Sequence, residues 1–365
     1  MDGKIRIIRR RHGGTHPYCG FMSLESAQRV REFHRSFAEY APTPLVRLTQ
    51  TAKSFGVRDI FVKDESSRFG LNAFKVLGGS YAIGSVLSKM PDVKPGEITF
   101  VTATDGNHGR GVAWAARRFG QKSVVYMPKG SSHIRLRNIK NEGADASVTD
   151  LNYDDTVRLA SDTALKNGWV LVQDTAFDGY EEIPRLIMQG YGTMALEAYE
   201  QLPEMPTHIF LQAGVGSMAA SVAGFFASVS AEKRPVIIIV EPDKADCVFR
   251  TAEADDGRRH FVTGDMDTVM AGLACGEPCT VAWDILSDCA DFFMTIPDSV
   301  AVKGVNILAR GGAGDEPIDS GESGAAAFGC AAEVLTDPEY NHIKNQLGID
   351  ESSILLFFST EGTLK

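Results

Sequence analysis

The chain has 365 residues with 37 basic and 47 acidic side chains, which gives a formal net charge of −10. A negative surface disfavours nucleic acid and anionic membranes, because both bind proteins through an excess of Lys and Arg. The length predicts about two domains, since single hydrophobic cores stop growing near about 250–300 residues. No apolar run approaches the roughly 20 residues of a membrane-spanning helix, and the start does not resemble a secretory signal. We therefore expect a cytoplasmic protein of enzymatic size.

The six cysteines are too sparse over this length to form a disulfide scaffold. The tightest pair, Cys275 and Cys279, lies in an apolar stretch with no second pair and no flanking histidine. Structural zinc sites use four ligands at characteristic spacings, so we interpret these residues as buried or loop thiols and expect no metal.

Short apolar runs alternate with helical patterns along the chain. The runs predicted to be buried strands are 98–102, 123–126, 170–173, 209–212, 236–240 and 354–358. The helical patterns between them are 108–119, 134–143, 154–167 and 218–226. Strands that are almost continuously apolar and alternate with helices are typical of parallel sheets covered on both faces.

We expect the first three predicted strands to form one small sheet and the last three to belong to another. The sequence therefore predicts an α/β protein with two doubly wound parallel-sheet domains and a cleft between them. The large domain is predicted to comprise residues 1–85 and 193–365, and the small domain, residues 86–192, to be inserted in it.

Open α/β sheets bind ligands at the carboxyl ends of their strands, so the loops there are candidates for chemistry. The strand at 209–212 is followed by residues 213–217 (AGVGS) and then by a helical pattern. Glycines let the backbone approach a ligand, and a helix N-terminus offers amide donors to a phosphate. The dinucleotide fingerprint would need glycine where Ala219 stands, so the loop suits a single phosphate. A purely structural glycine turn is the open alternative.

Two further segments are dense in reactive residue types. Residues 103–111 (ATDGNHGRG) combine three glycines with Asp, Asn and His, although a helix cap is the slightly preferred interpretation of this segment alone. Lys75 lies between Phe74 and Val76, and an apolar setting can activate a lysine as a nucleophile. On these residues alone, a lysine that extends its amine to solvent is the preferred alternative.

Taken in chain order, these pieces resemble the fold type II pyridoxal-phosphate enzymes, the tryptophan synthase β family. The resemblance rests on Phe74 and Lys75, residues 106–108 (GNH) and residues 213–217. Residues 359–362 (STEG) follow the last predicted strand, where the family has a serine or threonine that faces the pyridine nitrogen. Four pieces in the family's order make the resemblance specific.

Within this family the chain is most similar to the ammonia-lyases that act on diaminopropionate. Segments that carry this similarity include GLNAFKVLGG (70–79), TDGNHGRGVAWAA (104–116), QDTAFDGYEEIP (173–184), AGLACGEP (271–278) and SGESGA (320–325). The resemblance implies a homodimeric carbon–nitrogen lyase that converts D- and L-2,3-diaminopropionate to pyruvate and two molecules of ammonia. A serine or threonine dehydratase that releases water is the alternative. Many dehydratases of the family have serine where Asp105 stands, which favours the ammonia-lyase.

The resemblance also implies pyridoxal 5'-phosphate as the cofactor and a set of residues that hold it. The expected cofactor-binding residues are Phe74, Lys75, Asn107, Tyr153, Gly214, Val215, Gly216, Ser217, Ser359 and Thr360. In this interpretation Lys75 attaches to the cofactor, Asn107 hydrogen-bonds its phenolic oxygen, and Ser359 or Thr360 faces its pyridine nitrogen.

The expected catalytic residues are Lys75, Asp105 and Asp174. One base cannot reach Cα–H from both faces of a planar substrate complex, so Lys75 is expected to serve the L isomer and Asp105 the D isomer. Asp174 follows a predicted strand and therefore lies at a carboxyl end, where it can contact the substrate ammonium. A helix or turn cap is the equal alternative for Asp174.

Overall fold

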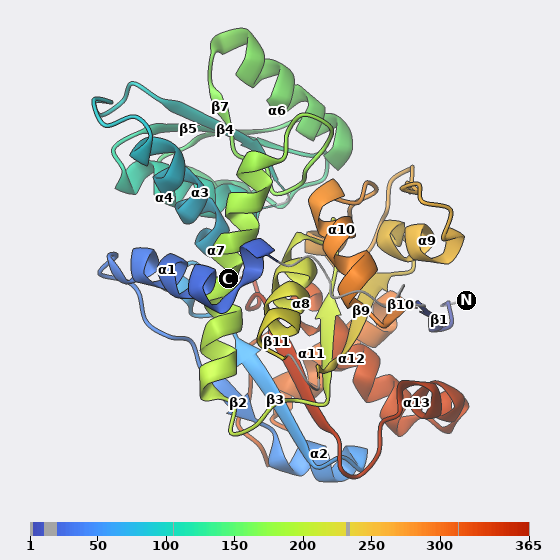
Figure 1. Ribbon diagram of the computed structural model, residues 1–365. Helices are drawn as coiled ribbons and strands as arrows, with labels where there is room; N and C mark the ends of the chain where they lie inside the picture. Colours follow the sequence, from blue (N-terminus) through green and yellow to red (C-terminus); the bar gives the residue numbers. More distant parts are fainter. Residues whose placement is uncertain (1–2, 11–19, 105, 231–233, 313, 365) are drawn as a thin grey trace.

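The computed structural model describes residues 3–10, 20–104, 106–230, 234–312 and 314–364. The predicted catalytic residue Asp105 lies outside the described residues. The described chain forms a seven-stranded sheet and a four-stranded sheet, and helices cover both (Figure 1).

The large sheet has a parallel centre and two antiparallel edges. Its strands, in spatial order, are β1 (Arg6–Arg9), β10 (Phe292–Ile296), β9 (Val236–Pro242), β8 (His208–Gln212), β11 (Ile354–Ser359), β3 (Asp59–Asp64) and β2 (Leu45–Arg47). The five central strands run parallel, whereas β1 pairs with β10 and β2 pairs with β3 in antiparallel register.

The small sheet is parallel throughout. Its strands, in spatial order, are β6 (Asp145–Val148), β5 (Lys122–Met127), β4 (Thr99–Ala103) and β7 (Val170–Leu171). The helices that connect or flank these strands are α3 (Val76–Ser88), α4 (Asn107–Arg118), α5 (His133–Asn141) and α6 (Tyr153–Asn167).

The remaining helices belong mainly to the layers around the large sheet. They are α1 (Leu24–Arg35), α2 (Thr49–Phe55), α7 (Glu182–Gln201), α8 (Ser217–Val229), α9 (Cys247–Ala254), α10 (Thr280–Cys289), α11 (Asp298–Arg310), α12 (Glu322–Thr336) and α13 (Asn341–Leu347). Short 3-10 turns occur at Gly20–Met22, Arg68–Gly70, Ala271–Leu273 and Pro338–Tyr340. In the described ranges, no helix combines the length and the apolar character needed to cross a bilayer.

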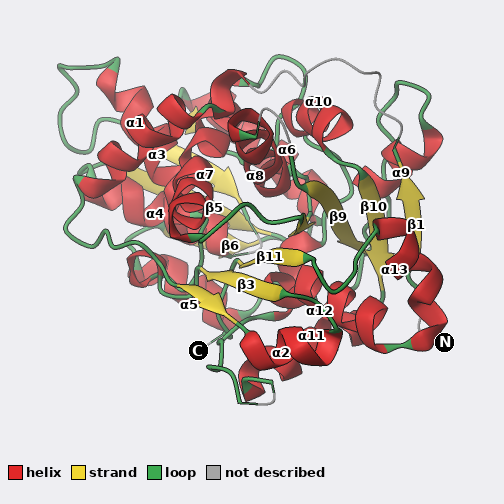
Figure 2. Cartoon of the chain, turned by 60° about the horizontal axis from the view of Figure 1, so that its bottom comes forward, coloured by secondary structure: helices red, strands yellow, loops and turns green. Residues whose placement is uncertain are grey.

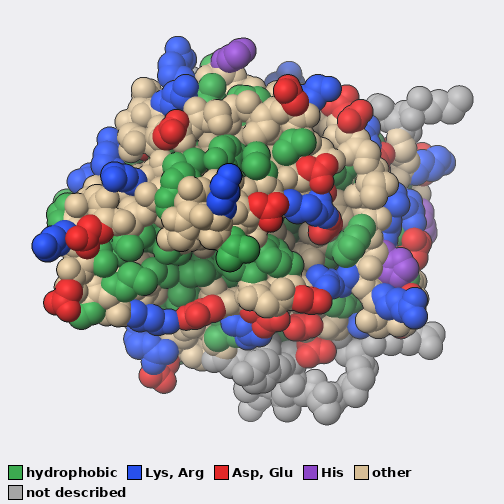
Figure 3. Space-filling view, turned by 90° about the horizontal axis from the view of Figure 1, so that it is seen from above, with side chains coloured by type: hydrophobic (Ala, Val, Ile, Leu, Met, Phe, Trp, Pro, Cys, Tyr) green, Lys and Arg blue, Asp and Glu red, His purple; other side chains and the backbone are tan. Residues whose placement is uncertain are grey.

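Hydrophobic cores lie on both faces of the large sheet. Along β9, Ile237 and Ile239 pack into the core that contains residues of α7 and α8, whereas Ile238 and Val240 pack into the core with residues of α11 and α12. Successive side chains of a strand point to opposite faces, which is why residues 236–240 of β9 are all apolar. Figure 2 shows the two helix layers on opposite sides of the strands. On the face seen in Figure 3, basic and acidic side chains are intermixed, with hydrophobic side chains exposed between them.

The predicted α/β fold with two sheets is confirmed, and each of the six predicted strands is present, as β4, β5, β7, β8, β9 and β11. The first three share the small sheet and the last three are neighbours in the large sheet, as expected. The antiparallel edge strands β1 and β2 were not predicted. The predicted boundaries at 85/86 and 192/193 fall inside α3 and α7, so the division into two domains at these residues stays a prediction.

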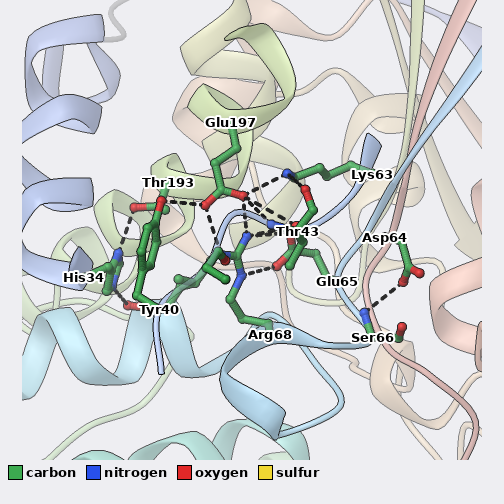
Figure 4. Close-up of polar contacts among 12 residues, drawn as sticks. His34, Tyr40, Thr43, Lys63, Asp64, Glu65, Ser66, Arg68, Thr193 and Glu197 are labelled. Carbon is green, nitrogen blue, oxygen red and sulfur yellow. Dashed lines mark hydrogen bonds and ion pairs between the residues drawn. The ribbon is translucent and has the colours of Figure 1, made fainter. Parts of the chain in front are cut away.

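A buried network of charged side chains holds the end of β3 against α7. Arg68 donates to Glu65 (Nε to Oε2, 2.8 Å) and to Glu197 (Nη2 to Oε2, 2.7 Å), and Lys63 donates to the same Glu197 oxygen at 2.8 Å. Figure 4 shows the Glu197 carboxylate between the two cations. All four side chains are at most 2% exposed, and their charges cancel. The network therefore fixes the start of the segment that leads to Lys75.

Candidate active site

The carboxyl ends of strands from both sheets meet at one pocket. Gln212 ends β8, Thr360 follows β11, Asn107 begins α4 after β4, and Asp174 lies just beyond β7. The lining residues are Phe74, Lys75, Asn107, Tyr153, Asp174, Tyr191, Gln212, Ala213, Gly214, Val215, Gly216, Ser217, Met218, Gly272, Leu273, Cys275, Ser323, Thr360 and Glu361.

Lys75 occupies the position just before α3, with its side chain 18% exposed in the pocket. The preceding backbone is unusual, because Phe69 (φ 50°) and Asn72 (φ 63°) both adopt positive φ. Such conformations are costly for a phenylalanine and persist where the surrounding structure enforces them. Here the chain after β11 supplies that constraint, since the Phe74 amide donates to the Thr360 carbonyl at 3.1 Å. The backbone next to Lys75 is thus held in place by the segment that follows β11.

Asp174 is the partner of Lys75. The Lys75 Nζ donates to Asp174 Oδ2 at 2.8 Å, His108 Nδ1 lies 3.8 Å from the same oxygen, and the Tyr153 hydroxyl donates to Oδ1 at 3.4 Å. Burial alone would raise the pKa of Asp174, but the cations formed by His108 and Lys75 outweigh it and lower the pKa to about 2. The carboxylate therefore stays ionised at neutral pH and provides a site for a cation.

The loop between β8 and α8 is built for an anion. Gly216 has a φ of +96°, a left-handed conformation that glycine adopts without strain, and α8 starts at the next residue. The first amides of a helix have no intrahelical acceptors and attract negative groups. Gly214 is constrained by space, because a Cβ there would lie 3.2 Å from Cys275 Sγ. The Ser217 hydroxyl donates to the Asp174 carbonyl at 2.7 Å, so Ser217 offers its amide to an anion.

Thr360 lines the pocket, whereas Ser359 does not. The Thr360 oxygen accepts a hydrogen bond from Gln212 Nε2 at 3.0 Å, which leaves its own hydrogen for an acceptor in the pocket. Ser359 is buried and donates to the Ser320 hydroxyl at 2.7 Å. Of the two predicted partners for a pyridine nitrogen, the geometry favours Thr360.

Asn107 and Glu361 both line the pocket and are hydrogen-bonded to each other. The Asn107 amide nitrogen donates to Glu361 Oε2 at 2.5 Å, and Glu361 is only 7% exposed. A carboxylate accepts hydrogen bonds and does not donate them, so Glu361 fixes the amide with its nitrogen toward the carboxylate. The second N–H of that nitrogen can then donate to a ligand oxygen.

The pocket brings together the described site residues that the sequence predicted, with the exception of Ser359. Sequence reasoning missed Tyr191, Gln212 and Glu361. Glu361 follows Thr360 directly in the STEG segment, and Gln212 ends a predicted strand. Both residues could therefore have been predicted as site residues from their position in the sequence. Tyr191 belongs to the buried helix α7 and carries no such signal.

Comparisons with known proteins agree with this geometry. The profile of the pyridoxal-phosphate dependent enzyme family matches residues 37–341. The diaminopropionate ammonia-lyase of Salmonella typhimurium is 50% identical over 376 residues, which cover 97% of this chain and 93% of that protein. A crystal structure of diaminopropionate ammonia-lyase from Escherichia coli, in complex with an aminoacrylate–PLP azomethine reaction intermediate, is similar with a TM-score of 0.93 at 46% identity, covering 99% of this chain and 94% of that one. The Escherichia coli enzyme in complex with D-serine gives a TM-score of 0.92 at 44% identity, with 99% and 95% covered.

Proposed function

Because the chain belongs to the pyridoxal-phosphate dependent enzyme family, we propose that it is a lyase that eliminates ammonia from D- and L-2,3-diaminopropionate. Elimination gives aminoacrylate and one ammonia, and hydrolysis of the aminoacrylate by one water gives pyruvate and a second ammonia. The observation that carries the proposal is the 2.8 Å ion pair between Lys75 and Asp174 in a pocket that also contains the N-terminus of α8. The names of the relatives, which share about half of their residues with this chain, support the same reaction.

The pocket residues fit pyridoxal 5'-phosphate. Lys75 would attach the cofactor, with Phe74 and Tyr153 bordering its ring, and the amides of residues 214–217 would hold the phosphate. Asn107 would donate to the phenolic oxygen, and the free hydrogen of Thr360 would meet the pyridine nitrogen. When bound, the cofactor withdraws electrons from the substrate and thereby acidifies its Cα–H. A hydroxyl at the nitrogen leaves the ring neutral and a weaker electron sink, which favours prompt loss of the β-group.

Two side chains then act on the L substrate. The amine of Lys75 would lie beside Cα of the bound substrate and accept its proton. The carboxylate of Asp174 binds the ammonium that the substrate carries on Cβ, as it binds the Lys75 ammonium in the structure described here. The Cβ–N bond breaks with its electron pair on nitrogen, and the nitrogen leaves as ammonia.

We propose Asp105 as the base for the D isomer. The argument is stereochemical, since the Cα–H of the D isomer lies on the face opposite to Lys75 and needs a second base. Asp105 stands between Thr104, which is buried, and Gly106, which precedes α4. Serine, which many dehydratases of the family have at this position, lacks a carboxylate for this role.

One experiment tests the reaction. The purified enzyme should absorb visible light through its cofactor, and it should release pyruvate and ammonia in a ratio of one to two from both isomers of diaminopropionate. L-Serine and L-threonine serve as the comparison, because a dehydratase would turn them over faster. Faster release of ammonia and a 2-oxo acid from either hydroxy amino acid than from diaminopropionate would favour the dehydratase.

We also propose that the enzyme acts as a homodimer in the cytoplasm. The support is the family resemblance and the net charge of −10, which keeps proteins from nucleic acid and anionic membranes. Light scattering coupled to size exclusion would test the assembly, because a dimer has twice the 39.5 kDa mass of the chain.

A further inference from the structure

Gln212 lies where strands β8 and β11 separate. The two strands pair as far as Ile209 and Leu356, whereas β8 continues to Gln212. Beyond the paired residues the side chain of Gln212 connects the strands, because its Nε2 donates to the Phe358 carbonyl of β11 at 2.9 Å. The side chain is 1% exposed and lines the candidate active site. Gln212 therefore belongs both to the sheet and to the pocket.

The orientation of the Gln212 amide is fixed by its surroundings. In addition to Phe358, its Nε2 donates to the Gly324 carbonyl of α12 at 3.2 Å. A carbonyl only accepts hydrogen bonds, so the amide nitrogen and not the amide oxygen faces these two groups. Oε1 is buried without a partner among the described residues, and turning the amide over would bring this oxygen against both carbonyls. The donor is thus retained here although the oxygen beside it is unsatisfied.

The same nitrogen decides which way the Thr360 hydroxyl points. Nε2 of Gln212 lies 3.0 Å from Thr360 Oγ1, and Thr360 also lines the pocket. A carboxamide nitrogen donates and does not accept, so the Thr360 oxygen accepts from it and cannot donate to it. Among the described residues, no acceptor for the Thr360 hydrogen is found. This hydrogen is therefore directed at an acceptor in the pocket.

We propose that Gln212 is a positioning residue that makes the Thr360 hydroxyl a donor to the pyridine nitrogen of the cofactor and so keeps this nitrogen unprotonated. The inference rests on the proposed function, in which Thr360 meets that nitrogen. A nitrogen whose lone pair accepts a hydrogen bond has no lone pair left for a proton. A protonated nitrogen would need the Thr360 oxygen as its acceptor, which would leave the Thr360 hydrogen without a partner at a residue that is only 5% exposed.

The protonation state of the ring decides how strongly it withdraws electrons from the substrate. A neutral ring holds less of the charge that removal of the Cα proton creates, so the electrons leave with the β-group instead. Gln212 thereby favours elimination over transamination, and it does so through Thr360 without a contact of its own to the substrate.

The test compares Gln212→Met and Gln212→Glu in the holoenzyme, with Gln189→Glu as the matched control. Methionine has a similar length and no donor, whereas glutamate presents an acceptor to the Thr360 hydroxyl. Gln189 lies on α7 outside the pocket, and its nitrogen likewise donates to a backbone carbonyl and a hydroxyl, those of Phe21 and Ser26. Each protein is reconstituted with cofactor that is isotope-labelled at the ring nitrogen, and the resonance of that nitrogen is followed by NMR as the pH is varied.

In the wild type and in Gln189→Glu, the ring nitrogen should resonate as a neutral pyridine at neutral pH. In Gln212→Met the midpoint of its protonation should rise by about one to two pH units, because the Thr360 hydroxyl is no longer confined to donating into the pocket. In Gln212→Glu the midpoint should rise further, since the carboxylate also adds negative charge. The other titratable side chains that line the pocket are retained in every variant, namely Lys75, Tyr153, Asp174, Tyr191, Cys275 and Glu361.

A second background separates positioning from a structural role. In Thr360→Val, the further change Gln212→Met should leave the titration of the ring nitrogen where it was, because Gln212 acts through the missing hydroxyl. A change that persists in this background would overturn the inference, since Gln212 would then act on the nitrogen by another route.

A protonated ring nitrogen in the wild type at neutral pH would also overturn it, as would titrations of both Gln212 variants that match the wild type. If neither Gln212 variant folds, the residue serves to join β8 to β11 and the inference is wrong. The proposed reaction is tested separately, through the release of pyruvate and ammonia from diaminopropionate by the wild-type enzyme.

Discussion

Replacing Asp174 with asparagine tests whether its carboxylate selects the diamino substrate. The structure gives the size of the effect, because its neighbours His108 and Lys75 lower the pKa of this buried group from 3.8 to about 2. That net lowering, in which His108 and Lys75 outweigh the opposing effect of burial, corresponds to roughly 2 kcal/mol at 1.36 kcal/mol per pH unit. If the β-ammonium of the substrate takes the place of Lys75, kcat/KM for diaminopropionate should fall on the order of 10- to 100-fold in Asp174→Asn.

The assay compares two substrates in two variants. Elimination from L-serine, whose β-group carries no charge, should fall much less than elimination from L-diaminopropionate. Asp178→Asn is the matched control, because Asp178 lies four residues further along, is 93% exposed at its side chain and does not line the pocket. Equal losses on both substrates would refute the reasoning, since they would assign Asp174 to holding Lys75 and not to binding the ammonium.

Four further changes test other parts of the site. Lys75→Ala should abolish turnover, and borohydride reduction of the wild type should fix the cofactor on Lys75 in peptide maps. Gly216→Val should lose cofactor on dialysis, because its φ of +96° strains a β-branched residue. Asp105→Asn should lower kcat for the D isomer about 10²–10⁴-fold and for the L isomer less. Glu197→Gln should lower the free energy of unfolding by about 3–5 kcal/mol in urea titrations, because it leaves one buried cation unpaired.

The Glu197 network also predicts how stability depends on pH. Burial raises the pKa of Glu197, but Arg68 and Lys63 outweigh it, so the folded-state pKa lies below the unfolded value. A depressed pKa stabilises the folded protein above the unfolded value of about 4.3 and loses that contribution as the pH falls toward the folded value. Acid unfolding of Glu197→Gln should therefore be less steep between these values than that of the wild type.

The elements that the sequence predicted share one physical feature. Strands β8, β9 and β11 are buried on both faces, so each contains an uninterrupted apolar run that stands out locally. Strand β3 was missed although it is equally buried, because it reads DIFVKD and contains Lys63. That lysine is tolerated because Glu197, 134 residues away, neutralises it. No local pattern can show a partner so distant in sequence.

The candidate site shows the same difference between features that depend on neighbouring residues and features that depend on distant ones. Gly214 and Gly216 were candidates because of a local property, the glycine turn between a strand and a helix, whereas Lys75 was predicted only through the resemblance to the family. The pairing of Lys75 with Asp174 spans 99 residues and depends on how the two sheets meet. Tyr191 was missed because α7 is buried over most of its length, so a tyrosine there is indistinguishable from a core residue until its hydroxyl is seen without a partner.

The charges of the pocket explain why it favours an amine as the leaving group. Asp174 is ionised and nearly buried, and Lys75 is its counter-ion in the described structure. If Lys75 is attached to the cofactor, as we propose, its pairing with this carboxylate would weaken, and a buried charge without a counter-ion is costly. A substrate with a second ammonium restores the pair, whereas serine or threonine offers only a neutral hydroxyl. The site thus discriminates by charge rather than by size, since an amino and a hydroxyl group occupy nearly the same volume.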